Sequence, residues 1–232
     1  MSGRRRTSPR TSRQTVIRLS MRVWDGPTRL LHWSIVLLLV ASYVSVSQGR
    51  TQLHFLSGYA ILTLLLFRLA WGFVGSETSR FGRYLRIPFA GLRATSDGGR
   101  APDGELGHTA SGGWMVLVLL AALAFAAVTG LFCSAGLVSE GPLAHAVDAV
   151  TAGQASALHT LGFYAVLGVT AFHLVSLAAY AGLKRETLLR PMITGRKRLP
   201  GNFRQPRMAS PLLALMLLVL SACIVWVIAT RI

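Results

Sequence analysis

The fold is decided by residues 157–173, ALHTLGFYAVLGVTAFH, which belong to an apolar run long enough to cross a membrane. Two histidines in this stretch, His159 and His173, stand fourteen residues apart. On an α-helix, fourteen residues rise about 21 Å and return to within about 40° of the starting direction. Both imidazoles should therefore leave one face of a single helix, near opposite surfaces of a bilayer.

Further runs of about twenty apolar residues accompany this one along the chain. Together they predict membrane spans at residues 30–47, 54–74, 114–134, 157–182 and 211–230. The composition agrees, because 52% hydrophobic and 14% charged residues do not suit an ordinary soluble domain. We therefore expect an all-α integral membrane protein, with a four-helix transmembrane bundle and a fifth, C-terminal transmembrane helix.

The net charge of +16 is distributed in a way that predicts the topology. Eight arginines precede the first span, five lie from Arg80 to Arg100, and eight Lys or Arg residues lie from Lys184 to Arg207. Only Arg50 and Arg231 fall on the other side of the predicted spans. The positive-inside rule places the N-terminus in the cytoplasm and the C-terminus in the periplasm of a bacterial inner membrane. Topology explains the charge, so no nucleic-acid partner is expected.

Four histidines lie near the ends of the predicted spans. His32 lies at the inner end of the first span, and His54 opens the second span on the outer side. The span that carries His159 and His173 enters from outside, so His159 is level with His54 and His173 is level with His32. Two b-type haems ligated by histidine pairs need this arrangement, because each planar macrocycle takes one imidazole from each side.

A membrane histidine can also lie among lipid headgroups or bond a neighbouring carbonyl, and any one of the four has that simpler interpretation. Four histidines matched in depth favour metal ligation, since ionisable groups inside membranes are costly and usually functional. No carboxylate or thiolate stands near them to complete a small metal site, so haem is favoured over a bare ion. His108 and His145 fall in loops and are not expected to be ligands. The two thiols, Cys133 and Cys223, are expected to be buried packing groups.

Two residues of the second span are further candidates for cofactor binding. Gly58 lies one turn beyond His54 and would let a macrocycle approach the backbone, although glycine is also common where membrane helices pack. Arg68 lies fourteen residues beyond His54 on the same face, where a haem propionate would require a cation. The alternative is that Arg68 extends to the inner headgroups.

Several motifs make the chain resemble a known family, the bacterial cytochrome b561 group, which includes the b-type cytochrome subunits of nickel-iron hydrogenases. The resemblance extends over residues 23–197 and rests on these segments: VWDGPTR (23–29) with HW (32–33), H (54) with GY (58–59), FRLAWGFVG (67–75), GH (107–108) with GGW (112–114), TGLF (129–132), KRE (184–186) and RPMITGRK (190–197).

This resemblance implies both cofactors and function. The family's axial haem ligands correspond to His32, His54, His159 and His173, so two non-covalent b-type haems are expected. Family members carry electrons between a redox partner and the membrane quinone pool. The expected partners are therefore membrane lipid, quinone and a dehydrogenase, hydrogenase or c-type cytochrome. The fifth helix carries no histidine, acid or amide, so it is expected to pack against a partner protein or, in a homodimer, a second copy of the chain.

The resemblance also divides the chain into regions. Residues 1–22 are expected to form a disordered basic cytoplasmic tail, because the first twenty contain no acid and no apolar core. Residues 23–197 form the predicted di-haem domain. Residues 198–232 add a linker and the fifth helix, which departs from the four-helix pattern of the family.

Three functional hypotheses remain open from the sequence. The first is a di-haem electron-transfer subunit that serves a separate redox protein. The second is a self-contained oxidoreductase that passes electrons from a small periplasmic reductant such as superoxide to quinone, although residues 135–156 contain no Lys or Arg to attract an anion. The third is a transporter or membrane anchor, which would require polar residues or broken helices near mid-membrane.

Overall fold

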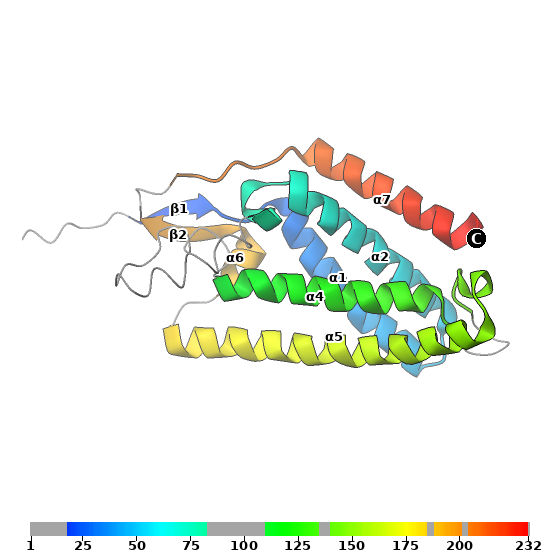
Figure 1. Ribbon diagram of the computed structural model, residues 1–232. Helices are drawn as coiled ribbons and strands as arrows, with labels where there is room; N and C mark the ends of the chain where they lie inside the picture. The colour runs from blue at the N-terminus through cyan, green and yellow to red at the C-terminus, as the bar shows by residue number, and fades with distance from the viewer. Residues whose placement is uncertain (1–17, 83–109, 135–139, 185–187, 201–203, 232) are drawn as a thin grey trace, which may run out of the picture.

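The computed structural model describes residues 18–82, 110–134, 140–184, 188–200 and 204–231 (Figure 1). Five long helices dominate it: α1 (Gly26–Ser47), α2 (Thr51–Val74), α4 (Ala110–Leu131), α5 (Ala149–Lys184) and α7 (Pro211–Arg231). Each contains a segment long and apolar enough to cross a membrane. The chain is thus a multi-pass, all-α integral membrane protein, as the sequence predicts.

The helices begin at or before the predicted span starts. α1 begins at Gly26 because the Asp25 side chain caps it, accepting a hydrogen bond from the Thr28 amide at 2.6 Å, and Pro27 suits the first turn. α5 begins at Ala149 rather than at residue 157. Asp148 caps that end, since its Oδ1 accepts a hydrogen bond from the Thr151 amide at 2.9 Å. Hydropathy alone misses these polar first turns.

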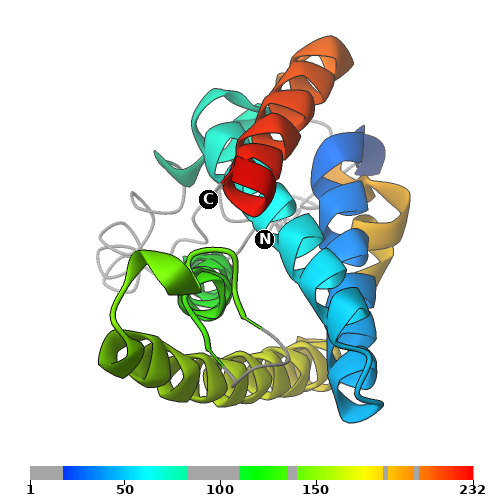
Figure 2. The same cartoon turned by 90° about the vertical axis from the view of Figure 1, so that its right-hand side faces the viewer.

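The membrane helices are arranged as two hairpins and one covering helix. α1 pairs with α2, and α4 pairs with α5, while α7 lies along α2 (Figures 1 and 2). α2 also contacts α4 and so joins the two hairpins. The main apolar core lies among α1, α2, α4 and α7.

Helix α5 contributes little to that core. Val166 is its one residue among the fully buried members of the main cluster. Only 11% of its most apolar membrane window is buried, against 33% for α2. α5 therefore keeps much of its surface available for lipid or for a cofactor between the hairpins.

A small ribbon closes the end of the bundle where α1 begins and α5 ends, which we call the basic end. Strand β1 (Arg18–Arg22) pairs antiparallel with β2 (Arg196–Pro200), next to helix α6 (Leu189–Thr194) (Figure 1). The ribbon is stabilised by the buried side chains of Val23, Trp24 and Leu199. The prediction of a disordered tail through residue 22 is therefore wrong for residues 18–22, while residues 1–17 lie outside the described structure.

Short 3₁₀ turns complete the described part of the chain. η1 (Glu77–Ser79) follows α2, and η3 (Ala144–Ala146) precedes α5. The predicted domain boundary between residues 197 and 198 falls inside β2, so this strand belongs to two of the predicted regions.

Candidate functional site

His54 of α2 and His159 of α5 face each other across the gap between the hairpins. Their ring centroids are 6.0 Å apart and their planes are inclined by 81°. Two imidazoles that bind one metal, each through a bond of about 2 Å, have ring centres about 6 Å apart. The observed spacing therefore fits a metal held between the two rings.

The other ring nitrogens of this pair are held by neighbouring helices. His159 Nδ1 lies 2.8 Å from the carbonyl oxygen of Ala126, and His54 Nδ1 lies 3.0 Å from Ser42 Oγ and 3.3 Å from the Ser42 carbonyl oxygen. A carbonyl only accepts, so His159 Nδ1 must carry the hydrogen, and the same tautomer suits His54. Each neutral ring then keeps an unprotonated Nε2, the form that ligates metals.

A cavity of about 270 Å³ surrounds this pair. It is lined by both histidines and by residues of α2, α4 and α5, among them Gly58, Tyr59, Leu62, Leu131 and Thr160. A Cβ atom added to Gly58 would meet nothing within 4 Å, so no helix packs against this glycine. Gly58 therefore leaves space in the cavity beside His54, as a bound macrocycle requires.

Gly130 of α4 leaves room for the His159 ring. A Cβ atom there would lie 2.9 Å from Cε1 and 3.0 Å from Nδ1 of His159. The absence of a side chain at Gly130 lets the His159 ring reach the Ala126 carbonyl on the same helix. The sequence contains the glycine but cannot show which side chain lies against it.

His32 of α1 and His173 of α5 form the second predicted pair, at the basic end. Both side chains are half-buried. His32 also meets Trp33 edge to face, with 5.2 Å between ring centroids. The pairing of His32 with His173 stays a prediction.

Arg68 lies on α2, fourteen residues beyond His54 toward the basic end. Its side chain is only 3% exposed, and its Cζ atom lies 4.8 Å from the centre of the Phe81 ring. A side chain so deeply buried does not extend to the lipid headgroups, so the alternative that Arg68 reaches the inner headgroups is wrong. The cation is held inside the bundle, over an aromatic face.

Asp25 is a buried carboxylate that the sequence analysis missed. It is 3% exposed, and its Oδ2 accepts hydrogen bonds from Ser79 Oγ at 3.0 Å and Trp71 Nε1 at 3.2 Å. Burial alone would raise the pKa of Asp25, but hydrogen bonds from Ser76, Thr28 and Ser79 outweigh burial and lower it. Asp25 joins α1, α2 and η1 at the basic end. Its helix-start pattern, Asp followed by Gly-Pro-Thr, is the signal that identifies it.

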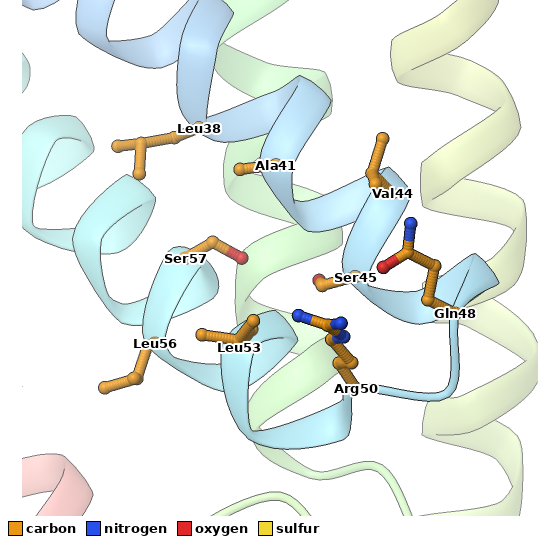
Figure 3. A pocket seen from close by; sticks show the side chains of 9 residues that line it. All are labelled: Leu38, Ala41, Val44, Ser45, Gln48, Arg50, Leu53, Leu56 and Ser57. Atoms are coloured by element: carbon orange, nitrogen blue, oxygen red, sulfur yellow. The ribbon is translucent and has the colours of Figure 1, made fainter.

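A second cavity, of about 440 Å³, lies between α1 and α2 at the end of the bundle away from the basic end (Figure 3). Leu38, Ala41, Leu53 and Leu56 form its apolar part, while Ser45, Gln48, Arg50 and Ser57 bring polar groups. Leu53 and Leu56 are exposed, so the cavity opens toward the lipid. It adjoins the segments that hold the His54 ring, because Leu53 precedes His54 and Ser45 lies one turn from Ser42.

The remaining candidate metal ligands of the described residues form no cluster. No group of three or more His, Cys, Asp or Glu side chains that could hold a bare metal ion occurs in the described ranges. His145 is exposed in η3, and His108 lies outside the described residues. Cys133 is half-buried, but Cys223 is exposed, so the prediction of a buried thiol at Cys223 is wrong. Cys223 belongs to a helix that has most of its surface outside the core.

Comparisons with known proteins give one finding. The family model for prokaryotic cytochrome b561 matches residues 23–195, a range that includes the four histidines, Gly58 and Arg68. Neither the curated proteins nor the solved structures contain a match to this chain.

Proposed function

The chain belongs to the prokaryotic cytochrome b561 family and is a membrane-bound b-type cytochrome that transfers electrons, and we propose that it does so through two haems. His54 and His159 would hold one haem, and His32 and His173 would hold the other. The observation that carries this proposal is the 6.0 Å separation of the His54 and His159 rings.

The residues around the first pair support ligation by Nε2. The carbonyl oxygens of Ser42 and Ala126 each accept from one Nδ1 group, which fixes the tautomer and the ring orientation. Gly58 has no side chain to fill the cavity beside His54. These contacts come from α1 and α4, so all four helices of the two hairpins contribute to one site.

A bound b-type haem supplies an iron that gains and loses one electron. Two imidazoles on one iron leave no open coordination position, which favours electron transfer over bond-forming chemistry at the metal. The protein's task is then to hold the ligands, exclude competing ligands and place the two pairs at different depths. Because α5 carries one histidine of each pair, it connects the two levels within a single helix.

We further propose that quinone exchanges electrons with this protein at the cavity between α1 and α2. The cavity opens toward lipid, which a long apolar molecule requires, and Arg50 and Gln48 offer hydrogen-bond donors to a quinone carbonyl at its polar end (Figure 3). A separate redox protein, such as a dehydrogenase, a hydrogenase or a c-type cytochrome, would complete the electron path.

The proposed orientation follows the charge distribution. The ribbon and α6 at the basic end carry Arg22, Arg190, Arg196 and Arg198, and the positive-inside rule places this end in the cytoplasm. The C-terminus after α7 would then lie in the periplasm of the bacterial inner membrane. Reaction of single introduced cysteines with a membrane-impermeant reagent would check this orientation.

The proposal is tested by the haem content and spin state of the purified chain. We expect about two b-type haems per chain and low-spin ferric signals, because both irons would have two imidazole ligands. A preparation with one haem per chain, or with a high-spin iron that binds added cyanide readily, would contradict the assignment of two histidine pairs.

A further inference from the structure

The ribbon of β1 and β2 has one face that is rich in arginine. In the strand register, Arg22 is directly opposite Arg196, and Ser20 is directly opposite Arg198. Residues that lie opposite each other in an antiparallel pair point to the same face, and so do residues two apart in one strand. Ser20, Arg22, Arg196 and Arg198 therefore share a face, and all four are exposed. We call Arg22, Arg196 and Arg198 the arginine face.

The opposite face of the ribbon is turned toward the protein. Leu199 is 1% exposed and clusters with Val23 and Trp24, and Met21 and Met192 pack against that cluster. On this face Met21 and Leu199 pack inward, Lys197 opposite Met21 is half-buried, and Leu19 opposite Leu199 is 48% exposed, whereas the three arginines lie on the outward face. The orientation of the ribbon on the bundle is set by this packing.

The arginine face lowers the stability of the ribbon in the isolated protein. Like charges directly opposite each other destabilise a β-sheet, and neither strand, RLSMR nor RKRLP, contains an acidic residue. The ribbon is nevertheless anchored firmly, because the amides of Val23 and Trp24 donate to the Gly195 carbonyl at 2.9 and 3.2 Å. Arg29 of α1 also donates to the carbonyl of Ile193. The backbone positions of three arginines are thus fixed next to one another on one face, which suits an anion with several oxygens.

Helix α6, next to the ribbon, indicates which kind of molecule carries that anion. Its Leu189 and Ile193 are 53% and 56% exposed, and they lie four residues apart on one side of the helix. Arg190, between them in sequence, is exposed as well. Exposed apolar side chains beside arginines are typical of elements that lie in the membrane interface. An acidic soluble protein would satisfy the arginines but would leave no apolar phase for Leu189 and Ile193.

We propose that the arginine face binds the phosphate groups of anionic phospholipids at the membrane surface of the basic end, while Leu189 and Ile193 enter the interface. The planar guanidinium group binds phosphate oxygens in a bidentate manner, so adjacent arginines can share one headgroup or hold two. This contact would fix the start of α1, and with it His32, relative to the lipid. It does not depend on the haem assignment.

The test is a lipid titration of the purified full-length chain in neutral detergent. Short-chain phosphatidylglycerol and phosphatidylcholine are added separately, and the bound lipid is counted by native mass spectrometry. A basic residue at an anionic surface contributes about 1 kcal/mol, so replacing two should weaken phosphatidylglycerol binding about 25-fold. We expect that loss in R22Q/R196Q, with phosphatidylcholine binding unchanged.

The chain offers a matched control on the same side of the membrane. Arg204 and Arg207 are also exposed, lie outside the ribbon and carry the same two charges. R204Q/R207Q should therefore bind phosphatidylglycerol much as the unmodified chain does. R198Q is a second test if the pair variant does not fold, and it should weaken binding about fivefold.

Three results would overturn the proposal. The first is equal affinity of the unmodified chain for the two lipids. The second is an equal loss of affinity in R22Q/R196Q and R204Q/R207Q, which would mean that only net charge matters. The third is displacement of phosphatidylglycerol by an equal concentration of inorganic phosphate, which would make the ribbon a site for the free anion.

Discussion

Replacing Gly58 with leucine should weaken haem binding without disturbing the packing of the helices. A Cβ atom at Gly58 meets no other atom within 4 Å, so the new side chain does not clash with the polypeptide. Instead it enters the cavity of about 270 Å³ beside His54 and His159. The helix itself should gain stability, since glycine is about 1 kcal/mol less favourable than alanine or leucine inside a helix.

The bound cofactor, in contrast, would have to share its space with the added side chain. Overfilling a packed site costs about 1–3 kcal/mol, which corresponds to an affinity loss of about 5- to 150-fold. We therefore expect G58L to be purified with close to one haem per chain in place of about two. The apoprotein should unfold at the same temperature as the unmodified apoprotein or higher.

Two other glycines serve as controls for this experiment. Gly168 on α5 is exposed and has no atom within 4 Å of its Cβ position, so G168L should keep both haems. Gly162 is buried, and its Cβ would lie 3.0 Å from Cα and Cβ of Ala126, so G162L should destabilise the α4–α5 hairpin with or without haem. If G58L kept two haems at unchanged affinity, the cavity beside His54 would not be a haem site.

Three further variants test other parts of the structure. D25N should lower the free energy of unfolding by about 2 kcal/mol at neutral pH, because one buried donor loses its acceptor; denaturant titrations measure this. The fold lowers the pKa of Asp25, so the carboxylate charge stabilises the folded state at pH values above the unperturbed pKa of 3.8, and this stabilisation is lost as the pH falls through the pKa of the folded state. D25N should lack that acid-dependent loss of stability. A dependence of stability on pH equal to that of the unmodified chain would contradict this role of Asp25. S42A removes the hydroxyl partner of His54 Nδ1 but keeps the Ser42 carbonyl, so it should weaken binding of one haem about 10-fold, measured by haem titration of apoprotein, whereas equal affinity would show that the Ser42 hydroxyl does not position the ring. A41F fills the cavity between α1 and α2 and should raise the KM for a quinol without changing the haem content; an unchanged KM would remove this cavity as a quinone site.

The helices of this protein could be predicted well because the membrane imposes a simple rule on their composition. Five apolar runs predict five helices, and each is present. The ends were less predictable, because residues 149–156 are mostly small or polar and α5 begins at the Asp148 cap, ahead of them. Hydropathy measures transfer into lipid, whereas helix ends depend on hydrogen bonds of single side chains.

The ribbon was not predictable, since its two strands are separated by most of the chain. Both strands, Arg18–Arg22 and Arg196–Pro200, are basic, and the usual interpretation of a basic segment is a solvated tail. The signal for pairing is the buried Leu199 packed with Val23 and Trp24, and that contact exists only in three dimensions.

The candidate site was predictable in outline and not in detail. The fourteen-residue spacing of His159 and His173 predicts two ligand levels on one helix, and both histidines lie on α5. The partners of the rings, Ser42 and the Ala126 carbonyl, belong to other helices, so helix geometry alone could not identify them. The sequence left Arg68 with two alternatives, and only its burial under Phe81 decides against the membrane surface.

The pairing of the four histidines is tested most directly by comparing two double variants for their content of low-spin b-type haem. H54A/H159A removes both ligands of one proposed haem and should keep about one haem per chain, as each of the two single variants should. H54A/H173A removes one ligand from each pair and should keep no low-spin haem. If H54A/H159A lost both haems, or if H54A/H173A kept one intact, the histidines would not be paired as proposed.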